Sequence, residues 1–163
     1  MARSSQYHHY IQRIDIGGQS PIDIEDWDNC PGLRYMKAEG IFDMGKSKNI
    51  YTEEYADSDR LRVYLPPDNN YTHESTTISM TFLVIGDAET RQTTIENFLE
   101  EVTTGVHRYW DDARNREFDF IVVDDVKIGE EKWHGSQPYA EITIPMKNLN
   151  GKTSVHESRT MPS

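Results

Sequence analysis

The sequence predicts a mainly β (α+β) fold, a β-sandwich or barrel of about seven strands on which one amphipathic helix docks. Two observations predict this fold class. Short runs that alternate between apolar and polar residues, separated by turn residues, are typical of strands with one buried face. A single segment, residues 88–104, has the apolar spacing of a helix instead. The chain has 163 residues, the length of one domain, which we expect to span residues 1–150.

The N-terminal part contains two strand candidates and an acidic loop. Residues 7–16 are expected to form the first strand, which Gly17-Gly18 ends. The side chains predicted to face inward from it are Tyr10, Ile14 and Ile16. Residues 21–32 form an acidic loop around Trp27, and residues 33–42 are a second, weaker strand candidate.

Residues 44–75 form a long, partly extended excursion before the central strand. Within it, residues 60–65 alternate cleanly, whereas residues 51–59 are acidic and aromatic without clear periodicity. Long excursions from compact domains often carry binding or contact functions. We therefore expect this segment to touch another molecule.

The central strand begins at Thr76 and ends before Gly86-Asp87. Its apolar side chains at every second position are predicted to be core residues: Ile78, Met80, Phe82 and Val84. Thr77, Ser79 and Thr81 share the opposite face. Near the strand's end Leu83 and Ile85 make that second face apolar, so we expect another part of the chain to cover it.

A helix follows the central strand directly. Asp87 has the position of an N-cap and Gly105 that of a C-terminal glycine cap. Four apolar residues at helical spacing are predicted to dock the helix on the sheet: Ile95, Phe98, Leu99 and Val102. Their burial is worth roughly 6–12 kcal/mol. Acidic residues on the opposite side are expected to face solvent: Glu89, Glu96 and Glu100.

The C-terminal part contains the remaining strands. Residues 106–110 and 117–126 are predicted strands around a turn, and residues 127–137 a polar loop that holds Trp133. In the last strand the expected inward residues are Ala140, Ile142, Ile144 and Met146. Pro145 has no backbone N–H, so this strand should lie at an edge or fray there. Residues 151–163 have almost nothing to bury, and we expect a flexible tail.

The charge of the chain limits its partners. Lys and Arg total 17 against 28 Asp and Glu, a net charge of −11, which argues against a basic nucleic-acid surface and against binding to anionic membranes. We find no stretch of transmembrane length and no signal-peptide core. Cys30 is the single cysteine, so no internal disulfide is possible and folding in a cytoplasm is expected.

The sequence predicts no catalytic, cofactor-binding or metal-binding constellation. The acidic loop carries Asp23, Glu25, Asp26 and Asp28 without the order of a calcium-binding loop, which favours a solvated loop. His8 and His9 are adjacent, so on a strand they face opposite ways and cannot share one metal. Cys30 has no activating base nearby in the sequence. We therefore expect a protein that is not an enzyme, and a hydrolase that uses one pair of the 28 carboxylates is the weakest alternative.

Three tryptophans leave an alternative open. Trp27, Trp110 and Trp133 are candidates for stacking on sugars, as in a carbohydrate-binding β-sandwich module. Most aromatic residues lie on or beside predicted strands, which favours core or subunit-interface positions.

From Arg60 to Leu149 the chain resembles the tail-tube and distal-tail protein family of long-tailed bacteriophages. The resemblance is carried by the strand that closes on residues 77–82, the break at residues 84–87, the single helix, the hairpin residues 108–112 and the final strand 139–146. Residues 48–53 and 135–139 also resemble small proteins of Bacteroidetes phages and prophages.

The resemblance implies a structural virion protein, assembled in the host cytoplasm into a ring of identical subunits, typically six. The ring would form or cap the tail tube, bind other tail proteins and let DNA pass without specific binding, with no cofactor and no membrane. Residues 44–75 would reach a neighbouring subunit. The contact residues expected are Lys48, Ile50, Tyr51, Tyr55, Tyr64 and Trp110. Tube, distal-tail and tail-completion roles all fit.

Overall fold

The computed structural model describes residues 7–46, 48, 51–53, 62–65 and 72–156 of the chain. It confirms the predicted fold class, because the described residues form a mostly antiparallel β structure with one α-helix, α1 (Ala88–Val102), and a 3-10 turn, η1 (Ile24–Asp26). The strands are β1 (His9–Arg13), β2 (Ile22–Asp23), β3 (Leu33–Glu39), β4 (Tyr51–Glu53), β5 (Arg62–Tyr64), β6 (Thr76–Ile85), β7 (His107–Asp111), β8 (Arg116–Ile121), β9 (Lys127–Ile128), β10 (Lys132–His134), β11 (Gln137–Asn148) and β12 (Ser154–Val155).

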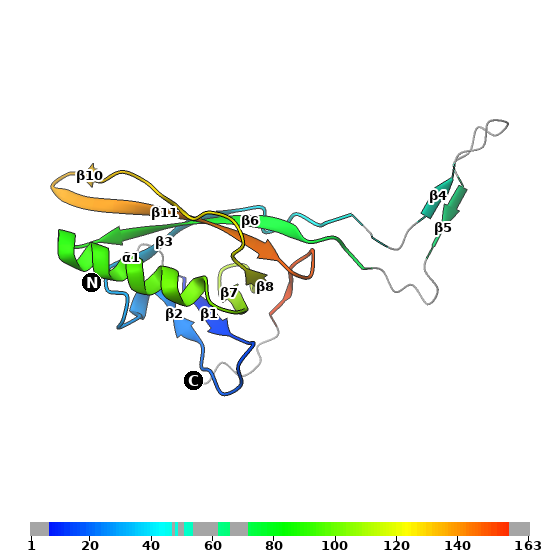
Figure 1. Ribbon diagram of the computed structural model, residues 1–163, viewed down its shortest axis with the longest axis horizontal. Coiled ribbons are helices and arrows are strands. Elements are labelled where there is room, and N and C mark those ends of the chain that lie inside the picture. The colour runs from blue at the N-terminus through cyan, green and yellow to red at the C-terminus, as the bar shows by residue number, and fades with distance from the viewer. Residues whose placement is uncertain (1–6, 47, 49–50, 54–61, 66–71, 157–163) are drawn as a thin grey trace.

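Ten of these strands form one open antiparallel sheet, with the main order β2-β1-β7-β8-β11-β6-β3. β9 and β10 pair with β11, and β12 pairs with β8. In Figure 1, β3, β6 and β11 run along one side of the body, β1, β2, β7 and β8 lie on the other, and α1 crosses in front. A single apolar core takes residues from both halves and from α1, so the fold is sandwich-like.

The longest pairing in the sheet joins β6 and β11, two strands that are distant in the chain. The two strands pair from Thr76↔Asn148 to Ile85↔Tyr139. All the residues of these two strands that are predicted to face inward are buried: Ile78, Met80, Phe82, Val84, Ala140, Ile142, Ile144 and Met146. On the second face Leu83 and Ile85 are half-buried, so that face is partly covered.

Helix α1 begins where its N-cap predicts, but it ends at Val102 with Thr103 as its C-cap, two residues before the expected Thr104. The Thr90 N–H donates to Asp87 Oδ1 (2.7 Å), and Gly105 has a φ of +78° just after the helix. The four docking residues lie against the core, with Ile95, Phe98 and Val102 buried and Leu99 half-buried. The ring of Phe98 meets that of Phe82 edge to face, with centroids 5.0 Å apart. Glu89, Glu96 and Glu100 are exposed.

The first strand differs from its prediction in the face that it buries. Ile16 is exposed and Tyr10 and Ile14 are half-buried, whereas His9 and Ile11 are buried. The register of β1 on β7, which pairs Ile11 with Tyr109, decides which face of β1 is buried. An error of one residue moves every side chain of a strand to the other face.

Three findings correct the C-terminal part. Residues 127–137 are not only a loop, since β9 and β10 within them pair with β11. β11 is not an edge strand, because Pro145 pairs with Ser79 of β6 on one side. On the other side β11 pairs with β9 before Pro145 and with β8 after it, so only the stretch around Pro145 has no partner strand on that side. β12 pairs with β8 and His156 is buried, so residues 151–156 do have something to bury. Residues 157–163 lie outside the described part.

Strand β3, at one end of the sheet, meets β1 and β7 of the other half through a set of side chains that we call the closure network: His9, Tyr35, Tyr109, Asp111 and Arg114. The rings of His9 on β1 and Tyr35 on β3 stack with centroids 3.8 Å apart. The Tyr109 hydroxyl and Arg114 Nη1 both donate to Asp111 Oδ2, at 3.0 and 2.8 Å. Arg114 Nη2 also donates to the Tyr35 hydroxyl (3.2 Å). The open sheet is thus closed by polar contacts.

Candidate assembly surface

An arm leaves the body between β3 and β6. We use this name for the described residues 40–46, 48, 51–53, 62–65 and 72–75. Its two sides pair near the body, where the Glu74 N–H donates to the Lys46 carbonyl (2.9 Å) and the Lys48 N–H to the Thr72 carbonyl (3.0 Å). Farther along, β4 and β5 form a two-stranded sheet of their own, which stands clear of the main sheet in Figure 1.

The arm is joined to the body by the side chain of Ile41, which is 5% exposed and belongs to the apolar core, and by main-chain contacts. The Gly45 N–H donates to the carbonyl of Gly151 (2.8 Å), in the turn between β11 and β12. A Cβ added at Gly45 would lie 1.8 Å from the carbonyl oxygen of Glu74, and one added at Gly151 would lie 2.3 Å from the same oxygen. Only glycine lets the three segments approach this closely.

Several apolar side chains of the arm face solvent. The exposed fractions are 72% for Phe42, 62% for Met44, 44% for Tyr64 and 60% for Leu65. A single exposed apolar residue is ordinary. A concentration of them on one projecting element is more typical of a surface that contacts another protein.

The contact residues expected from the sequence fall into three groups. Lys48 and Tyr64 are exposed on the arm, and Tyr51 lies opposite Tyr64 in the β4–β5 register. Ile50 and Tyr55 lie outside the described residues. Trp110, by contrast, is an internal residue.

The surroundings of Trp110 explain its burial. Its side chain is 3% exposed and stacks with Tyr10 (5.6 Å between centroids) and with His156 (4.8 Å). The contact with Tyr10 depends on the register of β1 on β7, which pairs Tyr10 with Trp110. The contact with His156 comes from the segment that was expected to be a flexible tail. The burial of Trp110 therefore could not be predicted from local sequence pattern.

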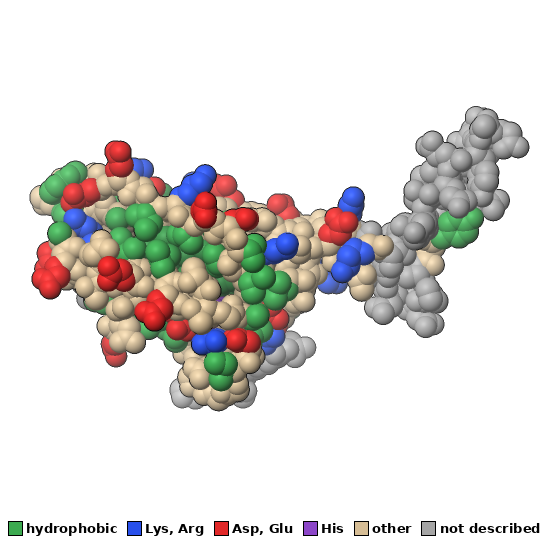
Figure 2. Space-filling model, in the orientation of Figure 1, with side chains coloured by type: hydrophobic (Ala, Val, Ile, Leu, Met, Phe, Trp, Pro, Cys, Tyr) green, Lys and Arg blue, Asp and Glu red, His purple; other side chains and the backbone are tan. Residues whose placement is uncertain are grey.

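The charged side chains of the body do not gather in one acidic patch on the face that Figure 2 shows. Red carboxylates are scattered over that face with blue basic groups between them, and a green apolar area lies between α1 and the strands beside it. On this face the acidic side chains are therefore scattered rather than gathered in one place.

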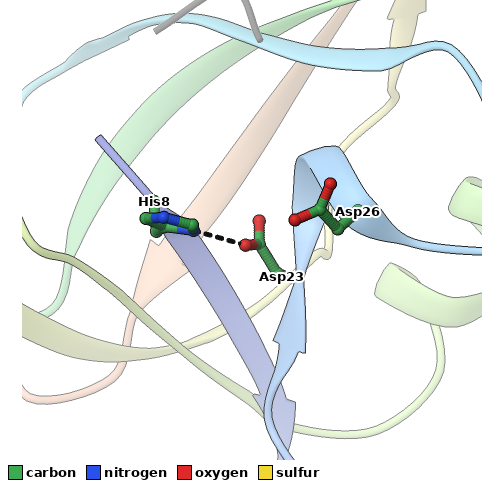
Figure 3. Close-up of side chains that lie close together, drawn as sticks. All are labelled: His8, Asp23 and Asp26. Atoms are coloured by element: carbon green, nitrogen blue, oxygen red, sulfur yellow. Dashed lines mark hydrogen bonds and ion pairs between the residues drawn. The ribbon is translucent and has the colours of Figure 1, made fainter. Parts of the chain in front are cut away.

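The acidic loop brings three possible metal ligands together. His8, Asp23 and Asp26 each offer one ligand atom, and these atoms lie within 4.8 Å of one another. Figure 3 shows that His8 Nδ1 points at Asp23, at 2.6 Å from Oδ2. This His8–Asp23 contact accounts for the proximity of two of the three groups without an ion, so we assign no metal here.

The loop is less solvated than the sequence predicts. Ile24 is fully buried and Glu25 is 8% exposed, with its Oε1 accepting from the Tyr35 N–H (2.9 Å). His8 and His9 do face opposite ways, since His9 Nδ1 reaches the Tyr109 hydroxyl (2.8 Å) inside the body. The loop therefore helps to close the sheet.

Two further observations concern the Cys30 thiol and membrane-spanning helices. Burial raises the pKa of Cys30 to about 12, so its thiol stays protonated at neutral pH and is a poor nucleophile. Among the described residues, no helix combines the length and apolar character needed to cross a membrane.

Comparison with known proteins gives a likeness in structure only. No protein-family model matches the sequence, and no curated protein does. Two solved structures of the phage p2 baseplate in its activated conformation, one with Sr and one with Ca, contain a chain of similar fold, with TM-scores of 0.54 and 0.50 at 11% and 12% identity.

In both structures the likeness covers 87% of this chain and 44% of the baseplate chain. This chain thus spans less than half the length of the chain that it matches. At such identities the likeness concerns the fold alone. The chain therefore shares its fold with part of a phage baseplate protein.

Proposed function

We propose that this chain is a structural protein of a phage tail, not an enzyme, and that it belongs to the tail-tube and distal-tail family of long-tailed phages. In this proposal it assembles into a ring, of six copies, that forms or caps the tail tube. The observation that carries the proposal is the fold shared with part of the phage p2 baseplate over 87% of the chain. The sequence resemblance over residues 60–149 supports it independently of that likeness.

The arm is the proposed contact with the neighbouring subunit. Its hairpin forms a separate sheet, and Phe42, Met44 and Leu65 expose more than half of their surface. Covering these side chains would release a favourable hydrophobic free energy of about 25 cal/mol per Å². The proposed contact residues are Lys48, Ile50, Tyr51, Tyr55 and Tyr64.

The remaining parts of the proposal follow from the same role. The ring binds other tail proteins, resides in the virion after assembly in the cytoplasm of a bacterial host, and comes from a Bacteroidetes phage or prophage. DNA passes through it without specific binding. A net charge of −11 supports that last point, because a negative wall repels phosphates.

The test is the assembly state of the full chain. Light scattering and negative-stain microscopy, over a range of concentration and salt, are expected to show rings or tubes. The double variant Phe42→Asp/Leu65→Asp should remain monomeric, whereas Val123→Asp/Ile128→Asp, which alters exposed apolar residues of the body, should still assemble. Equal melting temperatures for the two variants would show that both fold.

Two outcomes would contradict the proposal. A wild-type monomer at every concentration would argue against self-assembly and favour the carbohydrate-binding alternative. Rings formed equally well by the arm variant would leave self-assembly intact but remove the arm as its contact.

A further inference from the structure

The turn between β11 and β12 lies at the root of the arm and touches both of its sides. We call residues 149–156, which contain this turn and β12, the strut. On one side of the arm the Gly45 N–H donates to the Gly151 carbonyl (2.8 Å). On the other side a Cβ added at Gly151 would lie 2.3 Å from the carbonyl oxygen of Glu74. His73 Nδ1 joins the two sides by donating to the Gly45 carbonyl (2.9 Å). Three segments of the chain therefore meet at one junction.

The junction matters because paired main chain is interrupted between the main sheet and the arm. The pairing of β3 with β6 ends at Glu39↔Ser79. Among the described residues, main-chain hydrogen bonds across the arm resume only where the Glu74 N–H donates to the Lys46 carbonyl. In this gap Ile41 is the one buried side chain of residues 40–46. A connection with so few buried contacts bends easily, so a third support has a large influence on the direction of the arm.

The strut is held at both ends by β8. Before the turn the Leu149 N–H donates to the Asp119 carbonyl (2.9 Å). After the turn β12 pairs with β8, and the His156 N–H donates to the Asn115 carbonyl (2.9 Å). Gly151 lies between these two attachments. Because a segment fixed at both ends holds its middle in place, the junction is tied to the main sheet.

The far end of the strut is locked by the side chain of His156. This side chain is 7% exposed, and its ring stacks on Trp110 with 4.8 Å between centroids and 9° between planes. Its Nδ1 also lies 3.2 Å from Glu117 Oε2. The two residues of β12 itself, Ser154 and Val155, are exposed. Among the described residues of β12 and its C-terminal neighbour, His156 is thus the one buried anchor.

We propose that the strut sets the direction of the arm, and that the stack of His156 on Trp110 is the contact that locks the strut. The β4–β5 hairpin stands well away from the junction (Figure 1), so a small rotation at the root displaces the hairpin by much more. Trp110 then acts in assembly as a positioning residue. It does not touch the neighbouring subunit, but it holds the segment against which the arm rests.

The two parts of this inference have different foundations. The effect of the strut on the direction of the arm follows from the contacts at the junction alone. The effect on ring assembly rests on the proposed function. An arm that is already held in one direction loses less conformational freedom when it meets a neighbour, so the lock should favour assembly.

The test is the distance distribution between two spin labels on the full-length monomer, measured by pulsed electron paramagnetic resonance. The labels are attached at Tyr64→Cys on the arm and at Glu96→Cys on α1, both exposed positions. Cys30 is buried and its thiol is protonated, so it can stay in place without being labelled. We expect a narrow distribution in the labelled chain and a broad one when His156→Ala is added.

Three further variants make the test specific. Val155→Ala changes the neighbouring residue of the same strand, which is 55% exposed, and should leave the distribution narrow. His156→Phe keeps a ring that can stack on Trp110 and should restore a narrow distribution. In Gly151→Ala the added Cβ pushes the turn away from Glu74, which should broaden the distribution even if His156→Ala fails to fold.

Ring formation is the second measurement. His156→Ala should need an about tenfold higher concentration than the wild-type chain to form rings. The distance measurement requires no ring, so it decides the role of the strut even if the wild-type chain does not self-assemble. An unchanged distribution in folded His156→Ala, or equal broadening in Val155→Ala, would overturn the inference. Broadening without any change in ring formation would overturn the positioning role of Trp110 in assembly.

Discussion

The core and the arm of this protein differ in where their apolar side chains lie. In the core the rings of Phe82 and Phe98 are fully buried against each other. On the arm Phe42 is 72% and Met44 62% exposed. Since burial of apolar surface is the main favourable term in folding, the core stabilises the single subunit. The arm residues would gain this term only on contact with another molecule, so different residues serve stability and assembly.

The largest expected difference in stability is between alanine substitutions of one phenylalanine in the core and one on the arm. Phe82→Ala should lower the free energy of unfolding by about 3–5 kcal/mol, because it leaves a cavity among buried side chains. In a chain of this length the melting temperature should fall by roughly 6–20 °C. Phe42→Ala should change stability by about 0.5 kcal/mol or less. An equal fall in melting temperature for the two variants would contradict this division between core and arm.

The closure network should give the next effect. Asp111→Asn removes a buried charge that accepts from Tyr109 and Arg114, with an expected cost of about 2–3 kcal/mol in urea unfolding. The control Asp124→Asn alters an exposed carboxylate of the body and should cost about 0.5 kcal/mol or less. An unchanged free energy of unfolding in Asp111→Asn would mean that the closure network does not hold β3 against β1 and β7.

A smaller effect should appear in the pH dependence of stability. Burial lowers the pKa of His9 below its usual 6.5, against the opposing influence of Asp111 and Glu25. The Tyr109 hydroxyl donates to Asp111, so His9 donates from Nδ1, and its buried Nε2 has no hydrogen-bond partner among the described residues. Protonation in the folded state would therefore bury an unpaired N–H.

The sign of this effect follows from proton binding. As pH falls below about 6.5 the unfolded chain binds a proton at His9 that the folded chain does not, so stability decreases. His9→Gln should flatten this decrease between about pH 7 and pH 5, measured by denaturant unfolding at each pH. A variant that keeps the wild-type slope would place the titration at another histidine.

The smallest expected effect is at the N-cap of α1. Hydrogen bonds from Thr90 lower the pKa of Asp87, so its contribution is present above the unfolded carboxyl pKa and is lost as pH falls through the folded one. Asp87→Ala should lower the melting temperature slightly at pH 7, and Asp87→Asn should restore it, since Asn caps as well as Asp. A lowered melting temperature in both variants would point to the charge rather than the cap.

The elements that could be predicted from the sequence are those specified by local pattern. The strands β6 and β11 follow from their alternation, and α1 follows from its helical spacing and its N-cap Asp87. The buried face of β1 could not be predicted, because it depends on pairing with β7 and on burial of the polar His9. Hydrophobic pattern carries no signal for a histidine held by Tyr35 and Tyr109.

The candidate site was predicted in part. The excursion before β6 is present as the arm, and its exposed Tyr64 and Lys48 are where the sequence expects contact residues. Trp110 is internal because His156 returns from the chain's end to stack on it. Such a contact between segments 46 positions apart has no local sequence signature.

The glycine junction at the base of the arm has a consequence for how the protein can change over evolutionary time. Gly45 and Gly151 let main chain pack on main chain, so the direction in which the arm leaves the body does not depend on the side chains farther out. Residues of the β4–β5 hairpin can then be substituted to fit a different neighbouring protein while the direction of the arm stays the same. Variation is expected to be tolerated at the tip and to be restricted at these two glycines.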